Sequence, residues 1–422
     1  MFDEANSATN DCNRGITARN VASLAPTWER DGLVGVTGVP AVYDGTVYYG
    51  DETGTAWASR ATDGKVVWSA KLAGGQIVGA PAVTRDAVYV GLGGSLYRLD
   101  RATGKVVWKA TTNEDPSSQI NASPIVIDDM VVMGTASFQV TMKLEHYTFQ
   151  GSIGAFDTAT GKQRWNYVTT PNDSTSGAGQ AVWSTPSVDR DLGLLYIGTG
   201  QNLSPPAGPL GDSFLALDYR TGKVRWTMQA TKDDVFSAGY PEGFDFDFGA
   251  SPNLFTVKGR KLVGNGDKEG SYWVLDARTG RVVWKRKLTQ AGHFGGVIGS
   301  AGFHDGRLLV SSNVGKPSEF TPPATSKVFA LSPADGKVLW TKELEGSVFG
   351  PITGVPGVAF VGTSARRLYA LDPATGRTLW THEAPAPVGG GPSVVGRQVF
   401  WGYGFTLFSG PGKGGVLAFS PS

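Results

Sequence analysis

The chain has 422 residues with 38 basic and 37 acidic side chains, and its net charge of +1 lacks the basic surplus typical of nucleic-acid-binding proteins. No apolar run reaches the ~18 residues of a membrane-spanning helix. The single cysteine, Cys12, excludes intramolecular disulfides, cysteine-rich zinc sites and covalently attached c-type haem. The 59 glycines and 11% aromatic residues favour short strands joined by tight turns.

One phrase recurs along almost the whole chain. It reads Ala-Thr-Asp-Gly-Lys-Val-Val-Trp at 61–68 and Asp-Arg-Ala-Thr-Gly-Lys-Val-Val-Trp at 100–108. In each copy a strand ends before the turn, a glycine accepts a positive φ in the turn, and a second strand ends in tryptophan. The phrase therefore predicts a β-hairpin, which returns at 157–165, 218–226, 276–284, 332–340 and 372–380.

The tryptophans of these hairpins, preceded by Trp28, are spaced by 40, 40, 57, 61, 58, 56 and 40 residues. The shortest spacings match the ~40–45 residues of a four-stranded propeller blade, and the longer ones leave insertions that form loops. Trp28 ends a half-repeat whose first half, Val416 to Ser420, stands at the other end of the chain. We therefore predict an all-β fold, an eight-bladed β-propeller whose N- and C-terminal strands share one blade and close the ring.

The prediction places residues 1–422 in a single propeller domain, with the inserted loops in the blades between residues 109 and 340. The eight repeat tryptophans are expected to anchor the core.

The insertions hold side chains that the repeat does not explain. Asp245 and Asp247 alternate with phenylalanines, and two carboxylates are costly to bury without partners, so they are candidate catalytic groups. Their plainer reading is a pair of turn carboxylates. Trp183 is a further candidate because it lies outside the regular spacing of the repeat tryptophans. Lys268 and His293 are also candidates for the site, but Lys268 could instead be a solvated surface lysine and His293 a structural histidine.

Three longer segments resemble one known family. Ala-Val-Trp-Ser-Thr-Pro-Ser-Val-Asp at 181–189 and Gly-Thr-Gly at 198–200 look like a segment of the quinoprotein alcohol dehydrogenases, which use pyrroloquinoline quinone (PQQ). Gly-Phe-Asp-Phe-Asp-Phe-Gly-Ala-Ser-Pro at 243–252 and the ending from 402 to 420 are most similar to the polyvinyl-alcohol dehydrogenase branch. The resemblance covers essentially the full chain. The blade phrase by itself also occurs in non-catalytic propellers such as outer-membrane assembly lipoproteins.

The resemblance implies an alcohol dehydrogenase whose quinone lies near the propeller axis, beside a Ca²⁺ ion that polarises a quinone carbonyl. Hydride leaves the carbinol carbon while an aspartate takes the hydroxyl proton. By position this base is Asp245, and Asp247 is an additional carboxylate. The implied cofactor contacts are Trp183 as the stacking platform, Lys268 and Gln150, and the implied metal ligands are Gln201, Asn202 and Asp247.

The chain departs from the family pattern around the cofactor. An arginine of the family is replaced by Gln150, which removes a fixed positive charge. The metal-binding asparagine after Gly-Thr-Gly is replaced by Gln201, although Asn202 is adjacent. The metal-binding glutamate has no counterpart in the stretch that holds Gln139 and Glu145.

These departures leave two further hypotheses open. One is a propeller enzyme that has lost PQQ and performs non-redox acid–base chemistry, such as cyclisation, isomerisation or elimination, with Asp245 or Asp247 and with His293 or His146. The other is a non-catalytic scaffold propeller that presents its loops to a protein partner.

The remaining expectations concern partners and location. The substrate is a small molecule, and because no haem motif is present, electrons pass to a separate acceptor if the protein is redox-active. We expect no nucleic acid, no membrane span and a monomer. The given chain opens on Met1-Phe2-Asp3 without a signal-peptide pattern, whereas the resemblance implies a secreted or periplasmic protein.

Overall fold

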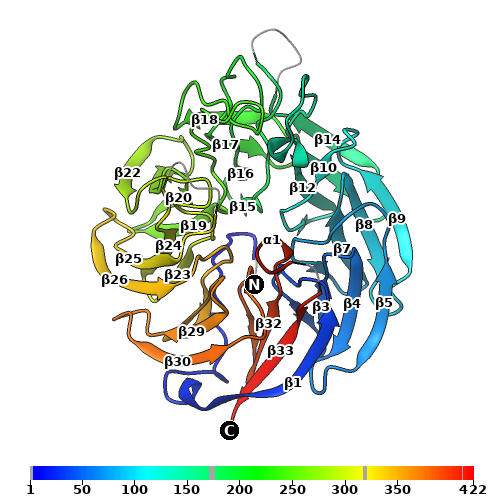
Figure 1. The fold of residues 1–422 in the computed structure, drawn as a ribbon, viewed down its shortest axis with the longest axis vertical. Helices are drawn as coiled ribbons and strands as arrows, with labels where there is room; N and C mark the ends of the chain where they lie inside the picture. The colour runs from blue at the N-terminus through cyan, green and yellow to red at the C-terminus, as the bar shows by residue number, and fades with distance from the viewer. Residues whose placement is uncertain (1–2, 171–175, 317–320, 411) are drawn as a thin grey trace.

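The computed structural model describes residues 3–170, 176–316, 321–410 and 412–422. It confirms the predicted all-β, eight-bladed propeller, because the described strands form eight antiparallel sheets arranged around one axis (Figure 1). Within the described ranges, helix is confined to two 3₁₀ turns, Val21–Ser23 and Phe138–Thr141, and the short helix α1, Thr406–Ser409. None of the described helices is long and apolar enough to cross a membrane.

The first four blades follow one another along the chain. Their strands are, for blade 1, β2–β5 (Ala41–Tyr43, Thr46–Gly50, Thr55–Arg60, Val66–Lys71); for blade 2, β6–β9 (Ala82–Val83, Ala87–Leu92, Ser95–Asp100, Val106–Thr111); for blade 3, β11–β14 (Ile125–Ile127, Met130–Ser137, Ser152–Asp157, Gln163–Val168), with β10 (Ser118–Gln119) beside β12; and for blade 4, β15–β18 (Ser187–Asp189, Leu194–Gly198, Ser213–Asp218, Val224–Gln229).

The other four blades complete the ring. Their strands are, for blade 5, β19–β22 (Asn253–Val257, Arg260–Gly266, Ser271–Asp276, Val282–Lys287); for blade 6, β23–β26 (Gly302–His304, Arg307–Asn313, Thr325–Leu331, Val338–Glu345); for blade 7, β27–β30 (Thr353–Val355, Val358–Gly362, Arg367–Leu371, Thr378–Glu383); and for blade 8, β31–β33 (Ser393–Val395, Gln398–Tyr403, Gly414–Pro421) with β1 (Leu24–Leu33).

Blade 8 is the predicted composite of both ends of the chain. Its outermost strand, β1, pairs antiparallel with β33, so that Trp28 stands opposite Ala418. This pairing joins the two ends of the chain in one sheet and so closes the ring. The predicted ring closure is therefore confirmed.

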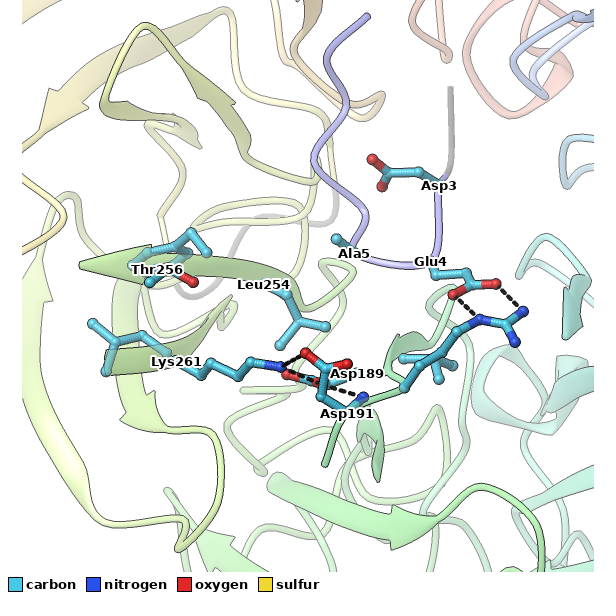
Figure 2. Close-up of a pocket in the computed structure, with 12 residues that line it drawn as sticks. Asp3, Glu4, Ala5, Asp189, Asp191, Leu254, Thr256 and Lys261 are labelled. Carbon is cyan, nitrogen blue, oxygen red and sulfur yellow. Dashed lines mark hydrogen bonds and ion pairs between the residues drawn. The ribbon is translucent and has the colours of Figure 1, made fainter. Parts of the chain in front are cut away.

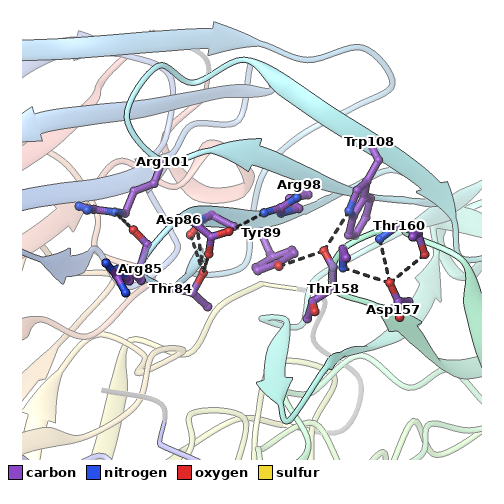
Figure 3. A network of polar contacts seen from close by, with 12 residues as sticks. Thr84, Arg85, Asp86, Tyr89, Arg98, Arg101, Trp108, Asp157, Thr158 and Thr160 are labelled. Atoms are coloured by element: carbon purple, nitrogen blue, oxygen red, sulfur yellow. Dashed lines mark hydrogen bonds and ion pairs between the residues drawn. The ribbon is translucent and has the colours of Figure 1, made fainter.

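The repeat tryptophans join each blade to the next. In blade 2 the indole N–H of Trp108 donates to the carbonyl of Thr158 in the hairpin turn of blade 3, at 3.1 Å (Figure 3). The ring also covers Gly161, where an added Cβ would lie 2.8 Å from it. The turn glycine is thus required twice, since its φ is +71° and the tryptophan occupies the place of a side chain. Matching indole hydrogen bonds run from Trp28, Trp68, Trp165, Trp226, Trp284, Trp340 and Trp380.

The insertions lie on one face of the ring. Because the strands of each blade alternate in direction, the loops between second and third strands and the connections between blades share a face, and the Thr-Gly turns lie on the other. The first strands of neighbouring blades contact one another and line the axis. Long loops after β12, β14, β16, β18 and β22 therefore meet at one end of the axis.

The N-terminal segment runs along the innermost strands of five blades. Its backbone carbonyls accept hydrogen bonds from Val188, Leu254, Phe303 and Gly354, and Asn10 donates to Val394. Beside it, a pocket of about 780 Å³ is flanked by Lys261, whose ammonium lies 2.7 Å from both Asp189 and Asp191 (Figure 2). The segment therefore ties first strands together that are distant in sequence.

Candidate functional site

Five segments of the insertion face bring the candidate residues together. Trp183 lies in the connection from β14 to β15, and Gln201 lies in the loop from β16 to β17. Asp245 and Asp247 lie in the connection from β18 to β19, Lys268 in the tight turn between β20 and β21, and His293 in the connection from β22 to β23. None belongs to a Thr-Gly hairpin, so the scaffold repeat and the candidate chemistry use different parts of each blade.

Asp245 is held on both carboxylate oxygens. The Lys268 ammonium lies 2.5 Å from Oδ1, and His293 Nδ1 lies 2.9 Å from Oδ2. All three side chains are buried. Phe236 stacks on the His293 ring with centroids 4.5 Å apart, which fixes the plane of the imidazole. Asp245 also has a φ of +58°, an uncommon conformation for a residue other than glycine, and such residues concentrate at functional sites.

Asp247 and Trp183 form the neighbouring contact. The indole N–H of Trp183 donates to Asp247 Oδ2 at 3.0 Å, and the Gln201 amide lies 3.4 Å from Oδ1. The far edge of the Trp183 ring rests on Gly249, where an added Cβ would lie 2.1 Å from a ring carbon. The half-buried indole is therefore held in one orientation from both ends.

Two buried aspartates that the sequence analysis did not single out lie beside these groups. Asp212 has no exposed surface, and its carboxyl group interacts with the carboxylate of Asp234. Asp234 is also buried. Asp234 follows Lys232-Asp233, a charged run typical of a solvated loop, and Asp212 stands alone after a glycine, so neither position carried a signal in the sequence.

The excess of buried carboxylates shifts their protonation equilibria. Burial raises the pKa of Asp247 to about 7, although Lys268 opposes the shift. Burial, reinforced by the Asp234 carboxylate, raises the pKa of Asp212 well above its usual range. For Lys268, burial opposes the charge, but Asp245 and Asp247 outweigh it and raise the pKa of the ammonium. The lysine is thus a permanent cation inside an acidic cluster.

The structure does not bring Gln150 and Asn202 into this cluster. Gln150 lines a polar pocket of about 520 Å³ together with Asn113, Asp115 and Asn166. Both amide atoms of Asn202 are used in holding loops, since Oδ1 accepts from Gly208 N at 2.8 Å and Nδ2 donates to the carbonyl of residue 177 at 2.7 Å.

The residues present fit the quinone but not the calcium site that the resemblance implies. A planar quinone needs a fixed aromatic platform and a cation beside its oxygens, and Trp183 and Lys268 provide these. Calcium takes roughly 6–8 oxygen ligands. Asn202 is committed elsewhere, and Gln139 uses its amide to hold Thr148 N at 3.0 Å. In the part of the chain that the structure describes, no three His, Cys, Asp or Glu side chains are grouped to hold a metal ion.

Comparison with known protein families gives two matches. Residues 11–291 match the family described as "Glucose/ethanol/alcohol dehydrogenase, beta-propeller domain". Residues 268–422 match the family described as "Outer membrane protein assembly factor BamB". The first match covers more than half of the chain and contains every candidate residue described above except His293, which lies two residues beyond it.

Among similar proteins, a polyvinylalcohol dehydrogenase of Pseudomonas sp is 27% identical over 411 residues, covering 83% of this chain and 62% of the relative. A quinohemoprotein alcohol dehydrogenase, ADH IIB, of Pseudomonas putida is 29% identical over 328 residues, covering 65% of this chain and 44% of the relative. The chain therefore spans less than two thirds of the length of either relative.

Solved structures show the same fold. A quinohemoprotein alcohol dehydrogenase from Comamonas testosteroni has a TM-score of 0.83 at 22% identity, with 99% of this chain and 79% of that chain covered. A europium-containing methanol dehydrogenase has a TM-score of 0.80 at 18% identity, with 99% and 96% covered. With the family match over residues 11–291, these findings show that the chain belongs to the β-propeller domain family of the glucose, ethanol and alcohol dehydrogenases.

Proposed function

We propose that this propeller oxidises an alcohol at the axial end of the insertion face, with Asp245 as the base that takes the hydroxyl proton. The observation that carries the proposal is the buried Asp245 carboxylate between Lys268 and His293. A base must be ionised and within hydrogen-bond reach of the proton that it removes. The Lys268 ammonium lies 2.5 Å from one carboxylate oxygen of Asp245, and His293, 2.9 Å from the other, gives the accepted proton a neighbouring group to which it can pass.

PQQ, which accepts hydride from an alcohol when bound, would rest on Trp183 and contact Lys268. Trp183 is suited to this because its indole is fixed by Asp247 on one edge and by Gly249 on the other. Lys268 is the buried cation that the described cluster offers to an anionic cofactor. No step is routed through a metal ion, because the oxygen donors described above do not fit a calcium site.

We expect the phenyl groups beside Asp245 to favour substrates with apolar carbon chains. The ring of Phe244 is 55% exposed and stacks on Phe246 at 5.1 Å, so two phenyl groups flank Asp245 in the sequence and meet the solvent beside it. Polyvinyl alcohol is the first substrate to test, because the Pseudomonas relative carries that name. Short primary and secondary alcohols complete the comparison.

The decisive experiment incubates the protein with PQQ and measures alcohol-dependent reduction of an artificial electron acceptor. We expect turnover by the parent protein and a loss of roughly 10²–10⁴-fold in Asp245→Asn, the range for removal of a general base. Asp305→Asn is the matched control, because Asp305 also has a positive φ, of +48°, but is exposed in the turn between β23 and β24. No turnover by the parent with any alcohol would refute the proposal.

A second candidate function is favoured by the His293–Asp245 contact together with the poor fit to calcium. A carboxylate that orients an imidazole is an arrangement for proton transfer without redox chemistry. Titration with PQQ, followed by tryptophan fluorescence, separates the two functions. Saturable quenching that is lost in Trp183→Ala supports alcohol oxidation with PQQ, and the absence of any quenching supports the non-redox function.

A further inference from the structure

Asp234 makes its contacts on both sides of Asp245. Its Oδ1 accepts from the backbone N–H of Phe244 at 2.9 Å, and its Oδ2 accepts from the N–H of Phe246 at 3.0 Å. One buried carboxylate therefore holds the backbone N–H groups of the two residues that flank the candidate base.

The backbone of Asp234 also joins its own loop to the loop between β16 and β17. The Asp234 carbonyl accepts from Asn202 N at 3.3 Å, and Phe236 N donates to the carbonyl of Asn202 at 2.8 Å. Gly243 packs so closely on the segment from Asp234 to Phe236 that an added Cβ would lie 2.0 Å from the Val235 carbonyl oxygen. The loop from Asp234 to Phe246 is thus tied to the β16–β17 loop at Asn202 and at its neighbours Gln201 and Leu203.

We propose that Asp234 is the positioning residue of the site, whose carboxylate fixes the left-handed backbone of Asp245 and so sets where the Asp245 side chain meets Lys268 and His293. This inference rests on the proposed role of Asp245 as the base.

The chemistry of the contact explains why a carboxylate is used. Two N–H groups need two acceptors, and a carboxylate supplies one oxygen to each with charge-assisted strength. An asparagine would turn an NH₂ group toward one of the two peptide N–H groups. Asp234 also keeps this role at an electrostatic cost, because its carboxylate lies near buried Asp212, whose pKa it helps to raise. A neutral acceptor would avoid that cost, and its absence points to the need for two acceptors.

A matched clamp exists elsewhere on the same face. Asp115 accepts from Ser117 N at 2.9 Å and from the Thr148 hydroxyl at 2.7 Å, so it holds the β12–β13 insertion as Asp234 holds its own loop. None of the described contacts of Asp115 reaches Asp245, Lys268 or His293. Asp115→Asn is therefore the control for loosening a loop of the insertion face without loosening the base.

The test compares Asp234→Asn with Asp115→Asn by hydrogen–deuterium exchange and by kinetics. In the protein without cofactor, we expect faster exchange in the segment 243–249 for Asp234→Asn and unchanged exchange there for Asp115→Asn. With PQQ and an alcohol, we expect kcat of Asp234→Asn to fall roughly 10–100-fold, the effect of misplacing a reacting group by about 1 Å. The alcohol KM should stay within about threefold, and the pH profile of kcat should move.

Asp234→Glu keeps the charge and displaces it by one methylene, so it should recover part of kcat, and it replaces Asp234→Asn if that variant does not fold. Unchanged exchange in 243–249 for both variants overturns the proposal, as does faster exchange with kcat within twofold of the parent. Faster exchange in a protein whose parent shows no alcohol oxidation refutes the proposed function and supports the clamp.

Discussion

The turn Asp51–Thr55 in blade 1 and the turn Asp267–Ser271 in blade 5 join the second and third strands of their blades in the same way. In each, the first aspartate N–H donates to the carbonyl four residues later at 3.0 Å. In each, a tryptophan indole donates to the aspartate carboxylate, from Trp57 at 2.8 Å and from Trp273 at 2.6 Å. The backbone and its supports are therefore shared.

The second residue of the two turns differs in charge and in what it contacts. In blade 1 it is Glu52, whose carboxylate bonds with the Thr406 hydroxyl at the start of α1. In blade 5 it is Lys268, whose ammonium bonds with Asp245. Both residues are 7% exposed. The second residue of this turn is therefore a buried position, and the residue that occupies it decides whether the turn fastens a loop or takes part in the acidic cluster.

The largest expected effect comes from removing the cation of the blade 5 turn. Lys268→Met leaves Asp245 and Asp247 buried without their ammonium partner, and breaking a buried pair costs about 3–5 kcal/mol of unfolding free energy. Lys285→Met is the control, because Lys285 is 37% exposed at its side chain and pairs with Glu269 on the surface, where a pair contributes about 0–1 kcal/mol. Denaturant unfolding measures both, and equal losses would contradict the assigned role of Lys268.

The scaffold half of this comparison was predictable from the sequence, and its reasons are local. A turn glycine, an aspartate before it and a tryptophan after it recur at fixed spacing, so the eight blades and their closure by Trp28 and the C-terminal strand follow from the repeat. The turn glycines could be recognised for the same reason, because each stands at the same distance in the sequence before its tryptophan.

The candidate site was predictable only in part. Asp245, Lys268 and Trp183 were identified by resemblance, and the structure brings them to one place. Asp234 and Glu52 were not identified, because what they contact depends on how loops from different blades close on each other. No periodicity records such contacts, and a charged residue in a polar loop is usually solvated.

An intermediate effect is expected from the glycine that the two turns share. Gly54 and Gly270 have φ of +84° and +94°, and an added Cβ would lie 2.4 Å and 2.6 Å from a backbone carbonyl oxygen. Alanine at either position should cost roughly 2–3 kcal/mol, of which about 1–2 is the left-handed conformation. Gly306→Ala, with φ of +74° and open space around it, isolates the conformational part. Thermal unfolding should give equal shifts for the two turns, and unequal shifts would contradict the shared scaffold.

The smallest effect is a pH dependence of opposite sign at the two turns. Burial raises the pKa of Glu52 above its ordinary value, so the stability that it contributes is present at low pH and is lost as the pH rises through the folded-state pKa. Glu52→Gln should therefore match the parent near pH 4 and exceed it by up to about 1 kcal/mol above pH 6.

Glu269 behaves in the other direction. Burial raises the pKa of Glu269, but the bonds from Lys285 and Lys287 outweigh it and lower that pKa. The stability that Glu269 contributes is therefore present above its unfolded-state pKa and is lost as the pH falls through its folded-state pKa. Glu269→Gln should lose a few tenths of a kcal/mol at neutral pH and match the parent near pH 3. Unfolding curves of both variants across this range test the pair. If the two slopes have the same sign, the difference between the turns is not set by the charges that surround each carboxylate.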